Sequence, residues 1–258
     1  MLLIEDKHTK PTNKCLTTAD EVRSLLQDYG PQFILPHLVN PSENCMEPEE
    51  FIEEILLEKM GAQIVVAGSD CRFGKNGRGN AKQLEKYAET RGFQALIIDP
   101  VRQDDTIITS EIIREDLLSG NLAQANRRLG YPYTLRGEVV RDNVAGKVSR
   151  IPTIKLETHP SKLIPAHGVY ATITKVDDKY FLGLTKIGQS PTVDDSPDVT
   201  IETFLLDFEQ DISGKTVETQ LNYYVREIRK FNSQDEVRTQ IDKDMEQVRN
   251  NFRINESA

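Results

Sequence analysis

Between Tyr131 and Tyr224 the chain alternates short apolar and polar runs with turn residues, and this spacing restricts its possible folds more than any other feature. The runs are separated by Gly, Pro, Asp and Asn, and they read YTLRGEVVRD, VYATITKV, YFLGLTKIG, VTIETFLLDF and KTVETQLNYYV. Short strands at such intervals are typical of a small antiparallel barrel or sandwich. We therefore predict an all-β region in the second half of the chain.

The sequence returns to a helical pattern after these runs. Ser233 and Glu236 have the spacing of a capping box at a helix N-terminus. One helical face downstream is apolar, and it carries Val237, Ile241, Met245 and Val248. We expect this C-terminal helix to pack against the barrel.

The first half instead alternates helix and strand signals. A helix is predicted in EPEEFIEEILLEKMG, with Pro48 in its first turn and Gly61 after its end. AQIVVAG and QALIID resemble buried parallel strands, with a helix in NAKQLEKYAETRGF between them. Two more helices should begin at the caps Ser110 and Asn121 and end at glycines. This order predicts an α/β region with a parallel sheet.

The change of pattern places a domain boundary at Gly130–Tyr131–Pro132. We therefore expect an α/β domain over residues 1–130 and a β-barrel domain with a C-terminal helix over residues 131–258. The 258 residues are enough for two modest domains, each with its own core.

Composition excludes several classes of protein. A formal net charge of -9 disfavours nucleic acid and anionic membranes as general partners, although a local basic pocket for a nucleotide remains compatible with it. Apolar runs fall short of the roughly 20 residues that cross a bilayer. The three cysteines are odd in number and lack a CxxC pair, which indicates a reducing cytoplasm: Cys15, Cys45 and Cys71. Histidines at metal-ligand spacing do not occur in the sequence.

A glycine-rich stretch follows the first predicted strand of the parallel sheet. VVAGSDCRFGKNGRGN carries Gly68, Gly74, Gly77 and Gly79. At the end of a parallel strand such a loop brings backbone N–H groups close to a phosphate or a ring. The spacing matches neither GxGxxG nor a P-loop, so this stretch taken alone favours a plain glycine-rich turn.

Several stretches then occur in one order: VVAGSDCRFG, ITSEIIR, GNLAQANRRLGYPYTLRGEVV, IPTIKL, HGVYATI, IGQSPTV, TIETFLLDF and YVREIRKF. In that order they resemble the bifunctional riboflavin kinase/FAD synthetase family of bacteria, from about Leu16 to Val248. The resemblance implies a Rossmann-like nucleotidylyltransferase domain that makes FAD from FMN and ATP. It also implies a six-stranded barrel that phosphorylates riboflavin, with ATP, Mg²⁺ and flavins as substrates or ligands.

The first domain departs from the family pattern in two ways. An HxGH-type loop is absent, as if roughly the first two βα units were missing. In ITSEIIR, Ser110 and Arg114 match the family signature, but Glu111 replaces a threonine. A carboxylate repels phosphates unless a metal ion intervenes, and Ser110 equally suits a plain helix cap. We expect adenylylation to be lost and the nucleotide site to be degenerate, its residues by resemblance being Gly68, Asp70, Phe73, Gly74, Ser110 and Arg114.

The barrel departs from the family at its ATP–magnesium loop. GKVSRIPTIK keeps Gly146, Pro152 and Thr153, while Arg150 replaces a glycine and Lys155 replaces an asparagine. By resemblance Thr153 is a Mg²⁺ ligand, and the loop holds ATP phosphates. A lysine ammonium offers a metal no oxygen, so Lys155 would add a positive charge or cover an abandoned pocket.

The remaining site residues of the barrel follow from the resemblance. Glu202 in TIETFLLDF matches the base that takes the proton of the riboflavin 5′-hydroxyl, although an ordinary strand glutamate is the alternative. The flavin-binding positions are Gly168, Tyr170, Arg226 and Phe231, each of which equally suits a structural role.

Three functional hypotheses remain open at this point. The chain is a riboflavin kinase with Glu202 as base, with adenylylation lost and kinase activity weak. Alternatively, it is an inactive flavin- or nucleotide-binding paralogue that acts as a sensor or as the partner of an intact enzyme. As a third option, an α/β stub is joined to a structural barrel without a ligand. Kept residues such as Glu202 and Thr153 favour the first, and the altered motifs favour the second.

Overall fold

A computed structural model describes residues 2–5, 14–28, 30–33, 35–38, 46–140, 153–189, 199–231 and 233–255. The chain forms two compact units, and the division falls within one helix, α1 (Ala19–Asp28). The first unit comprises Met1–Asn13 and Val22–Ile108, and the second comprises Lys14–Glu21 and Thr109–Ala258. The domain boundary at Gly130–Tyr131 stays a prediction.

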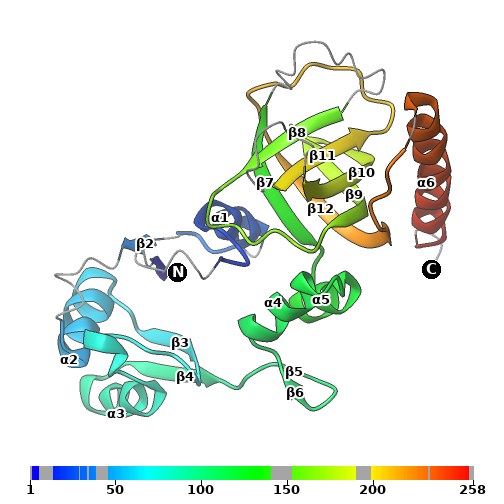
Figure 1. Ribbon diagram of the computed structural model, residues 1–258. Helices are drawn as coiled ribbons and strands as arrows, with labels where there is room; N and C mark the ends of the chain where they lie inside the picture. The colour runs from blue at the N-terminus through cyan, green and yellow to red at the C-terminus, as the bar shows by residue number, and fades with distance from the viewer. Residues whose placement is uncertain are drawn as a thin grey trace. The chain divides into compact units, whose positions relative to one another are not determined.

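The first unit contains helices and short parallel strand pairs (Figure 1). Strands β3 and β4 pair in parallel, as the sequence predicts, and β1 and β2 form a second parallel pair. A small antiparallel pair, β5–β6, ends the unit. The elements are β1 (Leu2–Glu5), β2 (Leu35–Leu38), α2 (Pro48–Glu50), η2 (Phe51–Lys59), β3 (Ile64–Gly68), η3 (Lys75–Gly77), α3 (Ala81–Arg91), β4 (Gln94–Ile98), β5 (Arg102–Gln103) and β6 (Thr106–Ile107).

The helix predicted after Glu47 begins as expected but changes its winding. Pro48 occupies the first turn, where it costs no hydrogen bond, and Glu47 and Glu50 form a capping box. From Phe51 the helix is π-wound, and the amide of Met60 donates to the carbonyl of Ile55. Its buried face forms the core of the first unit together with α3 and Phe93: Phe51, Ile52, Ile55, Leu56, Leu84 and Ala88.

The prediction that the two parallel strands are buried was wrong for one of their faces. Ile64, Val66, Leu96 and Ile98 are between 47% and 61% exposed, whereas the alternate residues pack against the core. Successive strand residues point to opposite faces, and helical cover reaches one face only in the described part of the chain. A β-branched run therefore indicated a strand correctly but not its burial.

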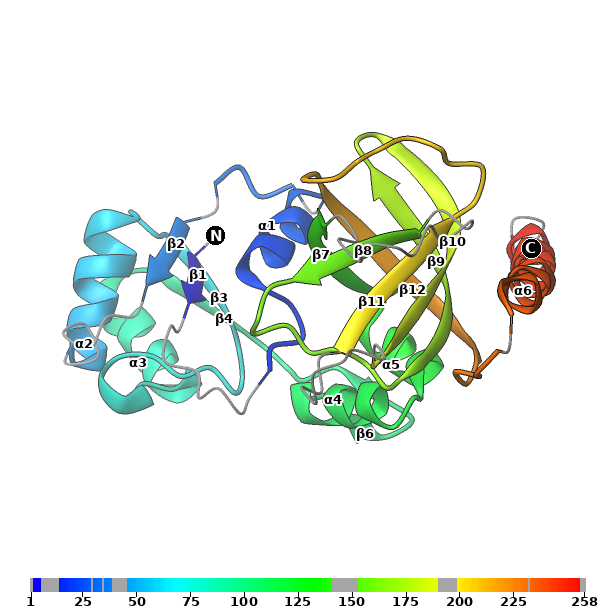
Figure 2. The same ribbon diagram turned by 45° about the horizontal axis from the view of Figure 1, so that its top comes forward.

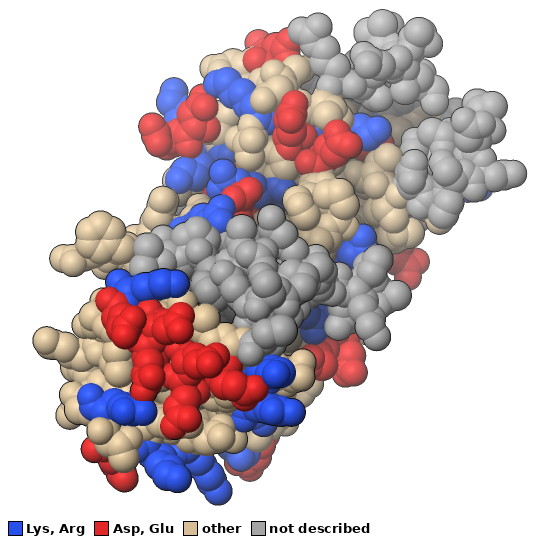
Figure 3. Space-filling model, turned by 90° about the vertical axis from the view of Figure 1, so that its left-hand side faces the viewer, with Lys and Arg blue, Asp and Glu red and all other residues tan. Residues whose placement is uncertain are grey.

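Acidic side chains gather on one side of the first unit in the view of Figure 3. The helix formed by α2 and η2 contributes exposed glutamates, which are Glu49, Glu50, Glu54 and Glu58. Their positions on the helix lie opposite its buried face, so the helix is amphipathic.

The second unit contains a closed barrel of six strands (Figures 1 and 2). The hydrogen-bonded order is β10-β11-β8-β7-β12-β9, and every neighbouring pair is antiparallel. The predicted barrel is confirmed. Its strands are β7 (Tyr133–Val140), β8 (Thr153–Thr158), β9 (Gly168–Val176), β10 (Lys179–Gln189), β11 (Val199–Leu205) and β12 (Thr216–Arg226).

Threonines make part of the barrel interior polar. Thr185 Oγ1 lies 3.1 Å from Thr172 Oγ1 and 2.8 Å from Thr203 Oγ1, and all three side chains are fully buried. Thr174 and Thr219 form a further hydroxyl pair at 3.1 Å. Because each buried hydroxyl has a partner, these threonines avoid the cost of an unpaired polar group.

Two short helices, α4 (Ser110–Leu118) and α5 (Leu122–Leu129), precede the barrel and belong to its unit. The cap of α4 is Thr109 rather than the predicted Ser110, since the Thr109 hydroxyl accepts from the amide of Ile112. Asn126 on α5 donates to the Leu221 carbonyl and accepts from the Tyr133 amide, both at 2.8 Å. This one side chain joins α5 to β12 and β7.

The predicted C-terminal helix is α6 (Gln234–Asn255), and it lies beside the barrel (Figures 1 and 2). Ser233 caps it, because its hydroxyl accepts from the amide of Glu236 at 3.2 Å. Met245 and Val248 are buried against Val169, Ala171 and Leu184 on the outer face of β9 and β10. Both the capping residue and the apolar stripe are confirmed. No helix within the described ranges has the length and apolar character needed to cross a membrane.

Candidate functional site

Glu202 projects from the outer face of the barrel between two lysines. In the register of β11 with its neighbours, Glu202 lies opposite Lys186 on β10 and opposite Lys155 on β8. The Lys186 ammonium contacts Glu202 Oε2 at 3.2 Å, and the Thr200 hydroxyl donates to Oε1 at 3.4 Å. About a third of the Glu202 side chain is exposed, so a ligand can reach it.

A cavity of about 250 Å³ lies on this outer face, next to α6 and the segment that follows β12. Its apolar wall comes from the barrel, from α6 and from Phe231, and its polar wall includes Glu202. The residues that line it are Thr153, Val169, Leu184, Lys186, Glu202, Phe204, Arg226, Ile228, Arg229, Phe231, Val237, Ile241 and Asp244. An apolar cleft with a few convergent polar groups is the usual form of a small-molecule site.

A second cavity of about 350 Å³ opens beside the segment that follows β11. Its lining residues are Val139, Val140, Thr153, Ile154, Thr203, Leu205, Phe208, Glu209, Gln210, Asp211, Ile212 and Ser213. Thr153 lines both cavities, so its exposed side chain lies where they adjoin. Two ligands bound in the two cavities would thus meet near Thr153.

Arg226 and Phe231 both line the cavity beside α6, and their contact with a flavin stays a prediction. The Arg226 guanidinium donates to Asp244 Oδ2 from two nitrogens, each at 2.8 Å, and lies 5.8 Å from the centre of the Phe231 ring. Gln240 donates to the other Asp244 oxygen at 2.7 Å. These contacts join the end of β12 to α6.

Gly168 and Tyr170 have packing roles in the structure, and their contact with a flavin stays a prediction. A Cβ at Gly168 would lie 2.4 Å from the Tyr224 ring, so only glycine allows this approach. Tyr170 is fully buried, its hydroxyl donates to the Ala166 carbonyl, and its ring meets that of Tyr224 edge-on at 5.4 Å. Burial raises the pKa of the Tyr170 phenol to about 12.

The residues predicted for the nucleotide site of the first domain do not all fall in one unit. Asp70 and Phe73 follow β3 in the first unit, between Gly68 and Gly74. Asp70 is exposed, whereas the Phe73 ring stacks on Phe51 at 5.7 Å. Gly74 has φ +68, and a Cβ there would meet the Pro48 backbone at 2.7 Å. The glycine at 74 therefore has a local structural reason.

Ser110 and Arg114 lie on α4 in the second unit. The Arg114 guanidinium donates to the Lys14 carbonyl at 3.2 Å and contacts Glu111 Oε1 at 3.6 Å. Hydrogen bonds from the Glu111 backbone and the Thr109 hydroxyl lower the pKa of the Glu111 carboxyl. The arginine therefore already has a carboxylate next to it. Gly146, Arg150 and Pro152 lie outside the described residues.

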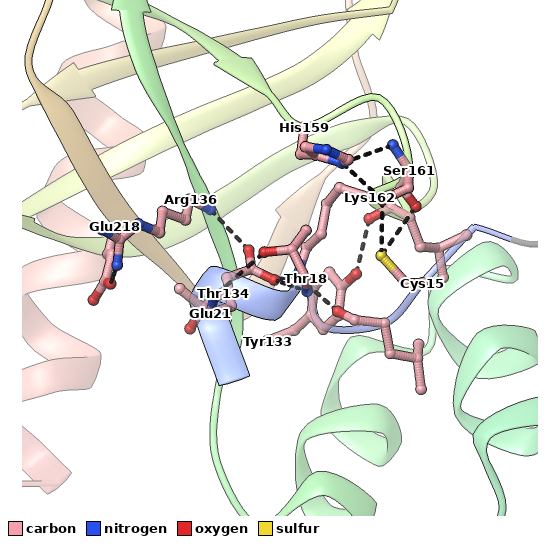
Figure 4. Close-up of polar contacts among 12 residues, drawn as sticks. Cys15, Thr18, Glu21, Tyr133, Thr134, Arg136, His159, Ser161, Lys162 and Glu218 are labelled. Atoms are coloured by element: carbon pink, nitrogen blue, oxygen red, sulfur yellow. Dashed lines mark hydrogen bonds and ion pairs between the residues drawn. The ribbon is translucent and has the colours of Figure 1, made fainter. Parts of the chain in front are cut away.

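A second polar cluster, which the sequence did not predict, joins the segment before α1 and the first turn of α1 to β7 and to the loop between β8 and β9 (Figure 4). Lys162 and Glu21 form an ion pair at 2.7 Å, with 2% and 4% of their side chains exposed. The Lys162 ammonium also donates to the Leu16 carbonyl and lies 4.3 Å from the centre of the Tyr133 ring. Burial lowers the pKa of Lys162, and burial also raises the pKa of Tyr133.

The charged and polar side chains of this cluster have hydrogen-bond partners. Glu21 accepts from the backbone amides of Thr18 at 2.8 Å and Arg136 at 3.1 Å. Nearby, the Cys15 thiol lies 3.2 Å from the Ser161 hydroxyl, and that hydroxyl lies 2.7 Å from His159 Nδ1 (Figure 4). A buried pair with this degree of hydrogen bonding holds the two segments together without leaving an uncompensated charge.

Two family models match this chain, and they cover separate ranges of it. The riboflavin kinase family model matches residues 129–252, which include the barrel and most of α6, and the FAD synthetase family model matches residues 3–112. The chain belongs to the bifunctional riboflavin kinase/FAD synthetase family. Membership agrees with the motif order in the sequence and with the six-stranded barrel.

Two relatives described as bifunctional riboflavin kinase/FMN adenylyltransferase illustrate the similarity. The protein of Listeria monocytogenes is 34% identical over 79% of this chain, and the match covers 64% of that relative's length. The protein of Bacillus subtilis is 27% identical over 93% of this chain and 76% of its own length.

A solved structure from Streptococcus pneumoniae, titled as a macrolide-efflux protein, is also similar. It has a TM-score of 0.79 and 26% identity, and the match covers 96% of this chain and 83% of that chain.

Proposed function

We propose that the barrel of this chain binds a flavin in the cavity beside α6 and Mg-ATP in the neighbouring cavity, and that it phosphorylates riboflavin slowly. The observation that carries the proposal is that Thr153 lines both cavities while Glu202 lines the first. A phosphoryl donor and a hydroxyl acceptor need such adjoining sites, because transfer depends on positioning the two reactants in line. The family match to riboflavin kinase supports the identity of the ligands.

Glu202 is the group in the flavin cavity that suits a general base. A carboxylate within hydrogen-bond reach of the riboflavin 5′-hydroxyl takes its proton as the oxygen attacks the γ-phosphorus of ATP. Both Glu202 oxygens have partners, Lys186 and Thr200, and these contacts hold the carboxylate in one orientation. The contact with Lys186 also competes with the substrate hydroxyl, which is a reason for slow turnover.

The nucleotide cavity offers oxygen ligands that suit Mg²⁺. Thr153 contributes a hydroxyl, and Glu209 and Asp211 contribute carboxylates to the same lining. Magnesium prefers such oxygens and keeps several waters or phosphate oxygens in its shell. Groups of three or more His, Cys, Asp or Glu side chains that could hold a metal ion do not occur among the described residues, so phosphate oxygens of ATP would supply further ligands. When bound, it would neutralise phosphate charge.

Adenylylation of FMN is not part of the proposed activity. Glu111 stands where the family has a threonine. The Glu111 side chain is 76% exposed and lies beside Arg114, so a negative charge sits next to the cation that would otherwise attract phosphate.

The test is incubation of the purified protein with riboflavin, ATP and Mg²⁺, followed by chromatographic separation of riboflavin, FMN and FAD. We expect FMN without FAD, and a loss of about 100-fold or more in FMN formation for Glu202→Gln, since a positioned base contributes on that order. Lys155→Asn, which restores the amide of the family motif, should raise the rate. Formation of FAD would contradict the assignment of the first domain.

A second candidate function is a flavin-binding protein without kinase activity. The ion pair of Glu202 with Lys186 favours it, because that contact occupies the proposed base. Flavin binding without FMN formation would select this candidate, and the absence of both would overturn the two proposals together.

A further inference from the structure

A row of residues with mostly charged side chains crosses the outer face of the barrel. Lys155, Glu202 and Lys186 are directly opposed on β8, β11 and β10, and the register continues through Val169 on β9 to Arg226 on β12. Directly opposed residues project from the same face of a sheet with Cβ atoms about 4.5–5.5 Å apart. The row therefore presents three cations and one carboxylate side by side.

Charges along this row do not balance evenly. Arg226 is matched by Asp244, which is 5% exposed and accepts from two guanidinium nitrogens. Glu202 lies between Lys155 and Lys186 in the strand register, and its carboxylate contacts the Lys186 ammonium. Among the described residues of this row, one carboxylate therefore lies between two lysines, which leaves one positive charge in excess.

Part of this row lines the cavity beside α6, and Lys155 lies one strand away from it, opposite Glu202. Lys186 and Glu202 line that cavity, and a further cation, Arg229, lines it as well. The Lys186 side chain is 36% exposed, so its ammonium is within reach of a ligand. This local surplus occurs in a protein whose formal net charge is -9, so it is a property of the site and not of the surface as a whole.

We propose that Lys155 and Lys186 bind the 5′-phosphate of a phosphorylated flavin, so that the cavity retains flavin mononucleotide in preference to riboflavin. The inference rests on the proposed function, because it takes the cavity beside α6 as the flavin site. Lysine ammonium groups form charge-assisted hydrogen bonds with phosphate oxygens. The neutral 5′-hydroxyl of riboflavin gains no comparable interaction.

A preference for the phosphorylated flavin has a consequence for catalysis. A kinase whose cavity retains its product releases that product slowly, and product release then limits turnover. The same two lysines that reduce the rate would make the protein a store or a sensor of flavin mononucleotide.

The test is a titration of the full chain with riboflavin and with flavin mononucleotide, each without ATP, followed by flavin fluorescence. The variants are Lys155→Gln, Lys186→Gln and the double variant. Lys175→Gln is the matched control, because Lys175 lies on β9 six residues from Val169, away from the row. A separate arm measures the affinity for a non-hydrolysable ATP analogue.

We expect the unaltered protein to bind flavin mononucleotide about tenfold more tightly than riboflavin, the effect of one charge-assisted hydrogen bond. The double variant should lose this difference because its affinity for flavin mononucleotide falls, and Lys175→Gln should keep it. Equal or tighter riboflavin binding would overturn the inference and leave the proposed function standing. If the double variant lost ATP-analogue affinity and kept its flavin preference, the lysines would belong to the nucleotide. Binding of neither flavin would overturn both proposals.

Discussion

The strands of the two units differ in how completely they are hydrogen-bonded to neighbouring strands. Every strand of the barrel has two hydrogen-bonded neighbours, and hydroxyl pairs fill part of its interior. The described strands of the first unit form separate two-stranded sheets, and one face of β3–β4 carries exposed Val66 and Leu96. Closure removes free edges and fixes the register of each strand. The barrel therefore keeps Glu202, Thr153 and Arg226 around one cavity although nearby motif positions have changed.

The largest loss of stability is expected when one partner of the buried ion pair in the second unit is removed. Lys162→Met leaves Glu21 buried without its cation, and we expect a loss of about 3–5 kcal/mol in the free energy of unfolding. Lys215→Met is the control, because the pair of Lys215 with Asp177 is largely exposed and contributes about 0–1 kcal/mol. Urea unfolding followed by circular dichroism measures both. Equal losses would show that the cluster of Figure 4 does not anchor the segment before α1.

Two substitutions in the first unit compare its covered and exposed apolar residues. Leu84→Ala opens a cavity in the core beside α3, so we expect a loss of about 2–5 kcal/mol. Val66→Thr changes a side chain that is 61% exposed, and its effect should stay within about 0.5 kcal/mol. Urea unfolding of both variants gives the comparison. A large loss for Val66→Thr would mean that another surface covers this face of the sheet.

Gly168→Ala tests the close packing at the end of the barrel nearest Arg226. The new methyl group would lie 2.4 Å from the Tyr224 ring, and we expect overpacking to lower the free energy of unfolding by about 1–3 kcal/mol. Flavin affinity, measured by fluorescence titration, should fall as well, since the neighbouring residue Val169 lines the flavin cavity. An unchanged stability would show that the ring moves without cost.

The smallest expected effect concerns alkaline pH. Burial raises the pKa of Tyr170 to about 12 from an ordinary 10.0, so below pH 10.0 its contribution to stability is fully present. Above that pH the unfolded chain ionises first, and the contribution is lost as pH rises through the folded pKa. Tyr170→Phe should make the alkaline decline in stability shallower, measured by unfolding at several pH values. Tyr180→Phe, at a side chain that is 62% exposed, should not change it.

Local patterns predicted much of this fold from the sequence. The alternating runs indicated the barrel strands, and the spacing of Met245 and Val248 indicated the face of α6 that packs on the barrel. The cap of α4 was misplaced by one residue because Thr109 and Ser110 both carry a hydroxyl. The π-helical winding after Phe51 has no signature in a pattern of apolar spacing, which does not distinguish a carbonyl four residues back from one five back.

Contacts between distant positions could not be predicted in this way. Lys162 and Glu21 are 141 positions apart, and nothing in either local sequence indicates the other. The contact of Glu202 with Lys186 depends on the register of β10 with β11, which is set only when the barrel closes. The family resemblance therefore indicated the proposed base, but nothing in the sequence indicated that lysines lie on either side of it.

Hydrogen exchange with and without flavin mononucleotide tests the central claim most directly, because it locates the flavin on the chain. We expect slower exchange in 183–189, 199–205 and 226–231 and in the first turns of α6, with no change in β3 or β4. Protection confined to the first unit, or none in the barrel, would contradict the account.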